Sequence, residues 1–334
     1  MAEWIRRTGS KSNFRYLRTG GQRVQDARTL ERIRKLAVPP GWKSVHIAAS
    51  ASAEIQAWGL DTKERKQYRY HARAVERGQL RKYYRVRELA KELPSLRARI
   101  RTHAARRELS RDTVAAAVVR LISESFFRIG GERYAEENKT FGIATLRKRH
   151  VEVSNGRAVF TYVGKKSIPQ RQVVANRELA RLVQRQLESP GTRLFRYRDG
   201  GRWHNLTARD VNAYLHETLG VSFSAKDFRT WGGTLRAATV LAELGPAASA
   251  TEAKRNVMTT MRLVASELGN TPAICRSSYV HPMVVARYLD DGETIRLPKT
   301  HSPSADRYAH SPEERALIRF LDLHFPERRR KARG

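Results

Sequence analysis

Cysteine is almost absent from this sequence, and so are the features of exported and membrane proteins. The single cysteine, Cys275, excludes an internal disulfide and any zinc site built from several cysteines, which fits a reducing cytoplasm. Residues 1–7 turn polar without the apolar region of a secretion signal, and no apolar run reaches about 18 residues. We therefore expect a cytoplasmic protein that is not bound to a membrane.

Acidic residues are also scarce relative to basic ones. The chain has 33 Asp and Glu against 65 Lys and Arg, which gives a formal net charge of +32. Such an imbalance is self-repelling unless a polyanion neutralises it, and the basic residues run through every segment instead of one amphipathic anchor. The expected partner is nucleic acid, and the expected location is the cytoplasm around the chromosome, at the nucleoid.

Nucleotide and metal motifs are missing from the sequence. It has no Asp/Glu cluster for Mg²⁺, no Gly-x-x-x-x-Gly-Lys-Ser/Thr loop and no helix-borne histidine pair for zinc. Gly130-Gly131 and Gly232-Gly233 are too short to indicate nucleotide binding, so we expect close packing or an approach of the backbone to phosphate there. We predict that the protein needs neither ATP nor a metal and has no cofactor.

Length and periodicity predict an α+β protein with two domains. The 334 residues are 40% hydrophobic, enough for a buried core in each domain. Residues 1–75 are expected to form a small β-rich domain, since apolar side chains alternate at Val45 and Ile47 and at Ile55 and Ala57. Residues 76–325 are expected to be mainly helical with a small β-hairpin sheet, and residues 326–334 to form a basic tail.

Capping residues and turns place the elements of the larger domain. The expected N-caps are Ser110 or Asp112, Asn176, Thr207, Ser224 and Ser311. Charged residues 73–103 are expected to form the first helix, and residues 251–268 a later one. Asn155-Gly156 predicts a hairpin between residues 150–153 and 158–163, with a third strand at 170–174.

Tyr279 is the candidate nucleophile. A phenol has a pKa near 10, so its attack on a phosphodiester requires cations that stabilise the phenolate and the transition state. Arg128 and Arg229 can supply guanidinium groups, and Lys165 on a hairpin can protonate the leaving oxygen. Most Arg, Lys and Tyr residues of so basic a chain are surface contacts, so the residues alone leave these roles open.

An ordered set of motifs extends over residues 35–290. They are Val38-Pro39-Pro40-Gly41-Trp42, Gln67-Tyr68-Arg69-Tyr70, Arg128-Ile129-Gly130 with Tyr134 and Glu137-Asn138, residues 142–146, Val163-Gly164-Lys165, Lys226-Asp227-Phe228-Arg229-Thr230-Trp231-Gly232 and Ser278-Tyr279-Val280-His281-Pro282. Together they resemble the poxvirus-like type IB DNA topoisomerases of bacteria. The resemblance implies a β-rich N-terminal domain and a helical catalytic domain that close around duplex DNA.

The resemblance also implies a role for each candidate residue. Tyr279 would form a 3′-phosphotyrosyl link, Arg128 and Arg229 would bind the scissile phosphate, Lys165 would act as general acid and Lys226 would assist near the phosphate. Asn270 stands where the family often has histidine. Its amide can donate a hydrogen bond to phosphate but cannot shuttle a proton. DNA contacts are implied for Gln67, Tyr68, Tyr70, Arg133 and Tyr134.

Two other functions remain open at this stage. A tyrosine recombinase shares this style of site, although recombinases usually carry His-x-x-Arg where this chain has Lys226-x-x-Arg229. A noncatalytic chromosome-coating protein would use the charge alone and leave Tyr279 without a special role. We favour a monomeric topoisomerase that relaxes positive and negative supercoils, and we expect His281 to have a structural role.

Overall fold

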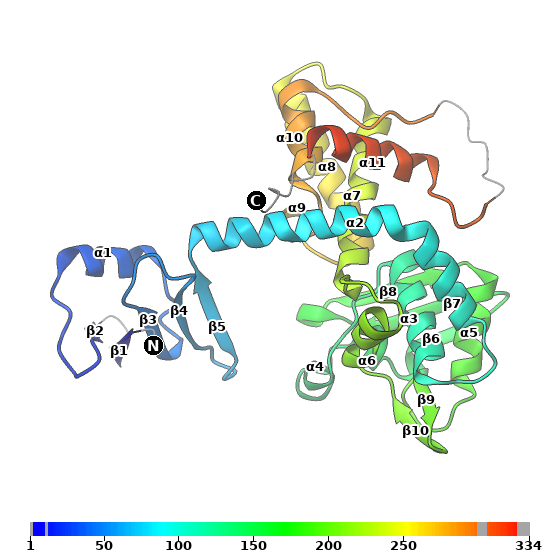
Figure 1. Ribbon diagram of the computed structural model, residues 1–334, viewed down its shortest axis with the longest axis horizontal. Helices are drawn as coiled ribbons and strands as arrows, with labels where there is room; N and C mark the ends of the chain where they lie inside the picture. The colour runs from blue at the N-terminus through cyan, green and yellow to red at the C-terminus, as the bar shows by residue number, and fades with distance from the viewer. Residues whose placement is uncertain (1–2, 11–12, 299–305, 326–334) are drawn as a thin grey trace, which may run out of the picture. The chain divides into compact units, whose positions relative to one another are not determined.

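The computed structural model describes residues 3–10, 13–298 and 306–325 (Figure 1). The chain divides into two compact units, residues 1–82 and 83–334. The predicted basic tail, residues 326–334, lies outside the described residues.

The first unit is a five-stranded antiparallel sheet with one helix. The sheet order is β2-β1-β3-β4-β5, and the elements are β1 (Trp4–Ser10), β2 (Asn13–Leu17), α1 (Ala27–Lys35), β3 (Lys43–Ala48), β4 (Ile55–Leu60) and β5 (Lys66–Tyr70). The predicted alternation is confirmed, because Val45, Ile47 and Ala57 are buried together with Ile33 of α1. Helix α1 was not predicted, since Ile33 is its one fully buried side chain and its apolar period is short.

The opposite face of this sheet carries a row of cationic and aromatic side chains. Strand register places Arg6 beside His46, His46 beside Trp58, and Trp58 beside Tyr68. The Trp58 ring stacks on His46 at 4.1 Å between centroids. The sheet therefore has one face that forms the core and one that is polar and aromatic.

The second unit is mainly helical. Its helices are α2 (Ala72–Ala104, which begins in the first unit), α3 (Arg111–Ser125), α4 (Glu132–Glu137), α5 (Arg177–Leu187), α6 (Ala208–Ala213), α7 (Ala225–Leu244), α8 (Ala250–Leu268), α9 (Pro272–Ser278), α10 (Pro282–Asp291) and α11 (Pro312–His324). Its strands are β6 (Val151–Ser154), β7 (Arg157–Val163), β8 (Pro169–Val174), β9 (Arg196–Asp199) and β10 (Arg202–Asn205). Strands β6, β7 and β8 form an antiparallel sheet, and β9 pairs with β10.

Most of these elements agree with the sequence prediction. Ser110, Asn176, Thr207 and Ser311 cap α3, α5, α6 and α11 through their side chains. The β6–β7 turn lies at Asn155-Gly156, where both residues have positive φ. The β9–β10 hairpin was missed, although the sequence Asp199-Gly200-Gly201 at its turn carries the signal.

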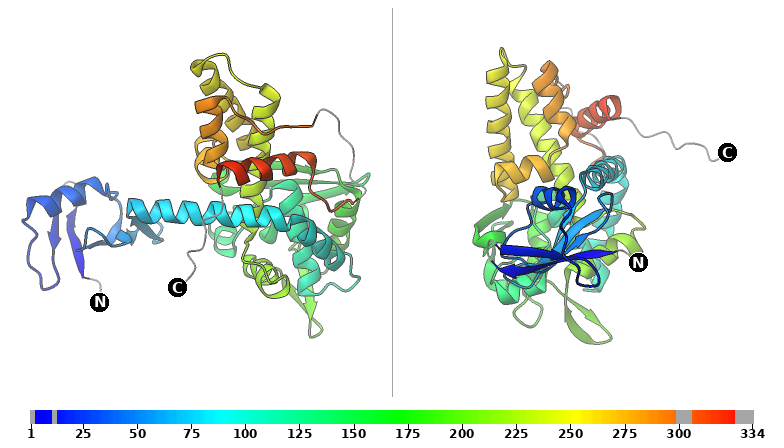
Figure 2. Two further views of the ribbon diagram at one scale, coloured as in Figure 1. Left: turned by 45° about the horizontal axis from the view of Figure 1, so that its top comes forward. Right: turned by 90° about the vertical axis from the view of Figure 1, so that its left-hand side faces the viewer.

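Helix α7 organises the core of the second unit. It packs against α3, α8, α10 and α11, and both views in Figures 1 and 2 show the yellow to red helices as one group. Thirteen of its 20 residues are buried, from Ala225 to Leu241. A helix so enclosed can hold a side chain at a fixed position, and Arg229 is one of the buried residues.

Candidate active site

Tyr279 lies in a short link between two helices. It follows α9 directly, and its N–H donates to the Cys275 carbonyl at 2.9 Å. Two residues later His281 caps α10, because its Nδ1 accepts from the Met283 N–H at 3.2 Å while Pro282 occupies the first helical position. This capping is the structural role expected for His281.

Helix α7 fixes the backbone on both sides of the nucleophile. The Thr234 hydroxyl accepts from the His281 N–H at 3.1 Å, and its one proton is shared between the Thr230 carbonyl at 2.7 Å and the Tyr279 carbonyl at 3.2 Å. A Cβ atom at Gly233 would lie 3.0 Å from the Tyr279 carbonyl oxygen, so glycine permits this close approach. The expectation of close packing at Gly232-Gly233 is confirmed. Thr234 was missed because only contacts between distant segments reveal its role.

Arg229 lies beneath the phenol, in the second turn of α7. Its guanidinium carbon is 5.1 Å from the centroid of the Tyr279 ring, and its side chain is almost fully buried. Nη2 donates to the Leu268 carbonyl at 2.9 Å, while Nε has no partner among the described residues. The guanidinium is thus oriented toward Tyr279 with donor capacity to spare.

Arg128 is held by the turn that follows α8. Its Nη2 donates to the Gly269 carbonyl at 2.7 Å and to the Oδ1 atom of Asn270. The amide of Asn270 makes one long contact, 3.5 Å to the Leu268 carbonyl, and so keeps capacity to donate. Asn270 therefore orients Arg128 through its oxygen and can offer its nitrogen to a phosphate.

Main-chain hydrogen bonds join the segment of Arg128 to the hairpin that carries Lys165. The Ile143 N–H donates to the Arg128 carbonyl, and the Phe141 N–H donates to the Val163 carbonyl, both at 2.8 Å. Gly130 has φ +82°, and a Cβ there would lie 2.8 Å from the Gly142 backbone. Lys165 itself is exposed in the turn between β7 and β8, as the sequence predicted.

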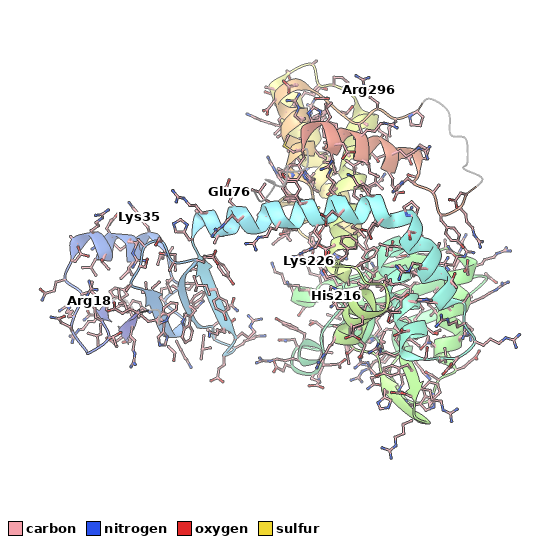
Figure 3. All side chains as sticks on the ribbon, in the orientation of Figure 1. Arg18, Lys35, Glu76, His216, Lys226 and Arg296 are labelled. Carbon is pink, nitrogen blue, oxygen red and sulfur yellow. The ribbon has the colours of Figure 1, made fainter. Side chains whose placement is uncertain are left out.

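These side chains surround one cavity of about 330 Å³. Its lining includes Arg128, Lys165, Lys226, Arg229 and Tyr279. Lys226 is exposed at the start of α7, where Figure 3 labels it. Asn270 is not among the lining residues, but its Oδ1 accepts from Arg128, which is. Five of the six residues singled out from the sequence thus meet around one space.

The cations around the cavity change the acidity of the phenol. Burial acts to raise the pKa of Tyr279, but the charge and hydrogen bond of Arg229, with the charges of Arg128 and Lys226, outweigh it. The net effect is a pKa below the usual 10.0. A larger fraction of Tyr279 is therefore phenolate near neutral pH than for a free tyrosine.

The candidate DNA-binding residues fall in both units. Tyr134 lines the cavity and is 49% exposed, and Arg133 beside it pairs with Glu137 at 2.7 Å. In the first unit, Tyr68 and Tyr70 are exposed on one face of β5 with ring centroids 5.8 Å apart. Gln67 points to the other face and donates to Asp61 at 2.9 Å. Tyr68 and Tyr70 are available to a ligand, whereas the amide nitrogen of Gln67 already donates to Asp61.

A second cavity of about 580 Å³ lies against other residues of α7. Three of its four arginines pair with carboxylates: Arg97 with Glu314, Arg101 with Glu178, and Arg120 with Glu124 and Glu178. The fourth, Arg307, donates to the hydroxyl of Tyr308 in the same lining at 3.2 Å, but it is exposed, in contrast to the buried Arg229 beside Tyr279. Among the described residues, no group of three or more His, Cys, Asp or Glu could hold a metal ion.

Comparison with known proteins identifies the family. The family model for the catalytic core of eukaryotic DNA topoisomerase I matches residues 71–300. This chain belongs to that family. The N-terminal domain of bacterial DNA topoisomerase IB matches residues 13–61, within the first unit. The chain is therefore an isomerase of the type IB DNA topoisomerase family, and it acts on DNA.

Viral relatives extend the similarity over most of the topoisomerase chain. A DNA topoisomerase 1B of Acanthamoeba polyphaga mimivirus is 29% identical over 313 residues, which cover 91% of this chain and 93% of the relative. A DNA topoisomerase 1B of Vaccinia virus is 28% identical over 182 residues, which cover 52% of this chain and 54% of the relative. The α+β class and the β-rich N-terminal unit agree with this family. Within the described residues, no helix is long and apolar enough to cross a membrane.

Proposed function

We propose that this topoisomerase relaxes positive and negative supercoils by cutting one DNA strand through Tyr279. The observation that carries the proposal is the cavity where a phenol of lowered pKa meets two arginines and two lysines. Tyr279 holds the 3′ end of the cut strand while the duplex beyond the cut rotates about the intact strand. Attack by the free 5′ hydroxyl on the ester then reseals the cut strand. The ester conserves the energy of the phosphodiester, so the proposal requires neither ATP nor metal.

In the proposed cleavage, a bond from phosphorus to the Tyr279 oxygen replaces the bond from phosphorus to the 5′ oxygen. The Tyr279 oxygen, after losing its proton to solvent, attacks phosphorus, and the bond from phosphorus to the 5′ oxygen breaks. Lys165 donates a proton to that oxygen, which leaves as a hydroxyl. Arg128 and Arg229 donate to the nonbridging oxygens, where such donors contribute roughly 3–4 kcal/mol each to the transition state. Lys226 adds positive charge beside the phosphate.

Asn270 takes a hydrogen-bonding role in this proposal. It holds Arg128 with its oxygen and donates from its nitrogen to a nonbridging oxygen. It cannot accept the phenol proton, so a lowered pKa of Tyr279 takes the place of a general base.

We further propose that different segments of the chain have different roles. Residues 1–75 form a DNA clamp that uses Gln67, Tyr68 and Tyr70, and residues 76–325 form the catalytic domain, with Arg133 and Tyr134 at the DNA. Residues 326–334 add basic charge. The protein works as a monomer on the nucleoid in the cytoplasm. Its net charge of +32 supports binding to DNA there.

The test is plasmid relaxation in EDTA without ATP, on positively and negatively supercoiled substrates. We expect wild type to relax both, and to form a covalent adduct with a nicked suicide duplex. The Tyr279→Phe variant, which lacks only the nucleophilic oxygen, should bind DNA but form no adduct. An adduct that persists in this variant would contradict the assignment. Relaxation only with paired sites would indicate a recombinase, and binding without cleavage in wild type a coating protein.

A further inference from the structure

Helix α2 contacts the chain segment that carries the nucleophile. The Tyr83 hydroxyl donates to the Val280 carbonyl at 2.9 Å in a buried hydrogen bond, and its ring lies 4.5 Å from that of His281. Burial raises the pKa of Tyr83 to about 12, so the hydroxyl keeps its proton across the physiological range. Val280 follows Tyr279 directly, so this bond restrains the position of the attacking phenol.

Two residues further along, α2 contacts the helix that carries Arg229. Arg85 Nη2 and Nε donate to the two carboxylate oxygens of Asp227 at 2.9 and 3.1 Å. Asp227 is 1% exposed, and its carboxylate also accepts from the Ser224 N–H and hydroxyl at 2.8 Å each. The first turn of α7, marked by Lys226 in Figure 3, is thereby joined to α2.

The charge of Asp227 makes this pairing important for the chemistry. In the sequence the residue lies between Lys226 and Arg229, two of the three cations that lower the pKa of Tyr279. An unpaired carboxylate there would oppose ionisation of the phenol and would draw these cations toward itself. Arg85 neutralises it in a bidentate pair, which is the strongest geometry for an arginine and a carboxylate. The cations of α7 then remain available to Tyr279 and to phosphate.

We propose that Tyr83 and Arg85 are positioning residues for strand cleavage. From a single helix they hold the nucleophile segment and the first turn of α7, so that the phenol and Arg229 meet in the reactive geometry. The proposal rests on the proposed function of Tyr279. Neither residue is among those that line the cavity.

The experiment measures single-turnover cleavage of a suicide duplex against pH with the full-length protein. The variants are Tyr83→Phe, which removes one hydroxyl, and Arg85→Gln, which leaves Asp227 unpaired. Because a shift of one pKa unit changes the ionised fraction about tenfold, we expect Arg85→Gln to cleave about tenfold more slowly at neutral pH. Its rate should regain the wild-type value at higher pH, while DNA affinity stays within about twofold of wild type.

Two further variants separate positioning from stability. In Arg85→Gln/Asp227→Asn the buried charge is gone as well, and we expect the pH profile to return toward wild type. The matched control is Arg97→Gln, which removes another α2 arginine from a bidentate pair, with the largely buried Glu314 at 2.6 and 3.0 Å. The control should lower the melting temperature without moving the pH profile.

The outcomes distinguish this inference from the proposed function. If wild type forms no adduct, the proposed function fails and this inference fails with it. If wild type forms the adduct but Tyr83→Phe and Arg85→Gln cleave with its rate and pH profile, only the positioning role is wrong. If the pH profile of Arg85→Gln matches that of Arg97→Gln, Arg85 contributes only to stability and has no positioning role.

Discussion

At the scale of single residues, the site is built around an arginine that is removed from water before DNA arrives. Arg229 is 3% exposed, and burial acts to lower its pKa, although the group stays cationic. A cation in such surroundings interacts more strongly with phenolate and phosphate than one in solvent. Its proposed role as a ligand of phosphate was predicted from the motif, but its burial depends on the packing of α7 and could not be read from spacing.

The pH dependence of cleavage should report this arginine. In wild type we expect the single-turnover rate to rise with pH through the lowered pKa of Tyr279, because phenolate is the attacking form. Arg229→Gln removes the nearest positive charge, so its profile should move to higher pH and its rate fall by about 10²–10³ at neutral pH. A mutant profile that overlays the wild-type profile would mean that Arg229 does not act on the phenol.

Lys165 is expected to matter only for the leaving group. Lys165→Ala should slow cleavage by about 10²–10⁴, the usual contribution of a general acid. A substrate with a 5′-bridging sulfur should restore the rate, since a thiolate leaves without protonation. The neighbouring exposed Lys166 offers a matched control, and Lys166→Ala should cleave either substrate as wild type does. Equal losses with both substrates would exclude the acid role.

At the scale of elements, the sequence predicted most of the longer helices and the short α6 but missed α1 and the β9–β10 hairpin. Caps such as Asn176 and Thr207 gave the starts of α5 and α6 because a polar side chain is needed where helical N–H groups lack partners. The strands of the β9–β10 hairpin have four residues each and no buried alternation, so periodicity could not reveal them. Contacts such as Tyr83 with Val280 join segments 197 residues apart and leave no local pattern.

The close approach of Gly233 in α7 to Tyr279 predicts the effect of a Gly233→Ala substitution on cleavage. A Cβ at Gly233 would lie 3.0 Å from the Tyr279 carbonyl oxygen and 3.3 Å from its Cβ, so Gly233→Ala should displace the nucleophile and slow cleavage. Misplacement by about 1 Å can cost roughly 10²-fold, and a shift of a few tenths of an ångström should cost less. The helix itself gains about 0.5–1 kcal/mol from the alanine, which offsets part of the strain.

Gly78 of α2 is the matched control for Gly233. A Cβ at this position would meet nothing within 4 Å, so Gly78→Ala should stabilise the protein by about 0.5–1 kcal/mol without changing cleavage. Thermal unfolding and single-turnover cleavage measure both effects. If Gly233→Ala cleaves as fast as Gly78→Ala, the close approach to Tyr279 has no catalytic importance.

At the scale of the whole molecule, we expect the net charge to set the affinity for DNA and a few residues to set the chemistry. The excess of 65 basic over 33 acidic residues predicted a nucleic acid as partner from composition alone, and the family match, which indicates DNA, agrees. Composition could not show which cations touch phosphate, because most of them lie on the surface.

Salt dependence can assign those contacts. For the noncleaving Tyr279→Phe protein, the logarithm of the binding constant should fall linearly with the logarithm of salt concentration. Arg133→Ala in this background should reduce the slope by about 1, because one phosphate contact is lost. Tyr70→Ala should weaken binding with the slope unchanged, since a neutral side chain releases no counterion. An unchanged slope in Arg133→Ala would remove Arg133 from the DNA interface.

The contacts of Thr234 with the nucleophile segment have a mechanical consequence. In the proposed mechanism, the pull of the turning duplex reaches the protein through the phenol oxygen and the side chain of Tyr279. Thr234 lies against the main chain at the Tyr279 carbonyl and the His281 amide, so the load that arrives at the main chain passes into α7, of which 13 of 20 residues are buried. A largely buried helix then anchors the broken strand, which would keep its ends in register for rejoining under torque.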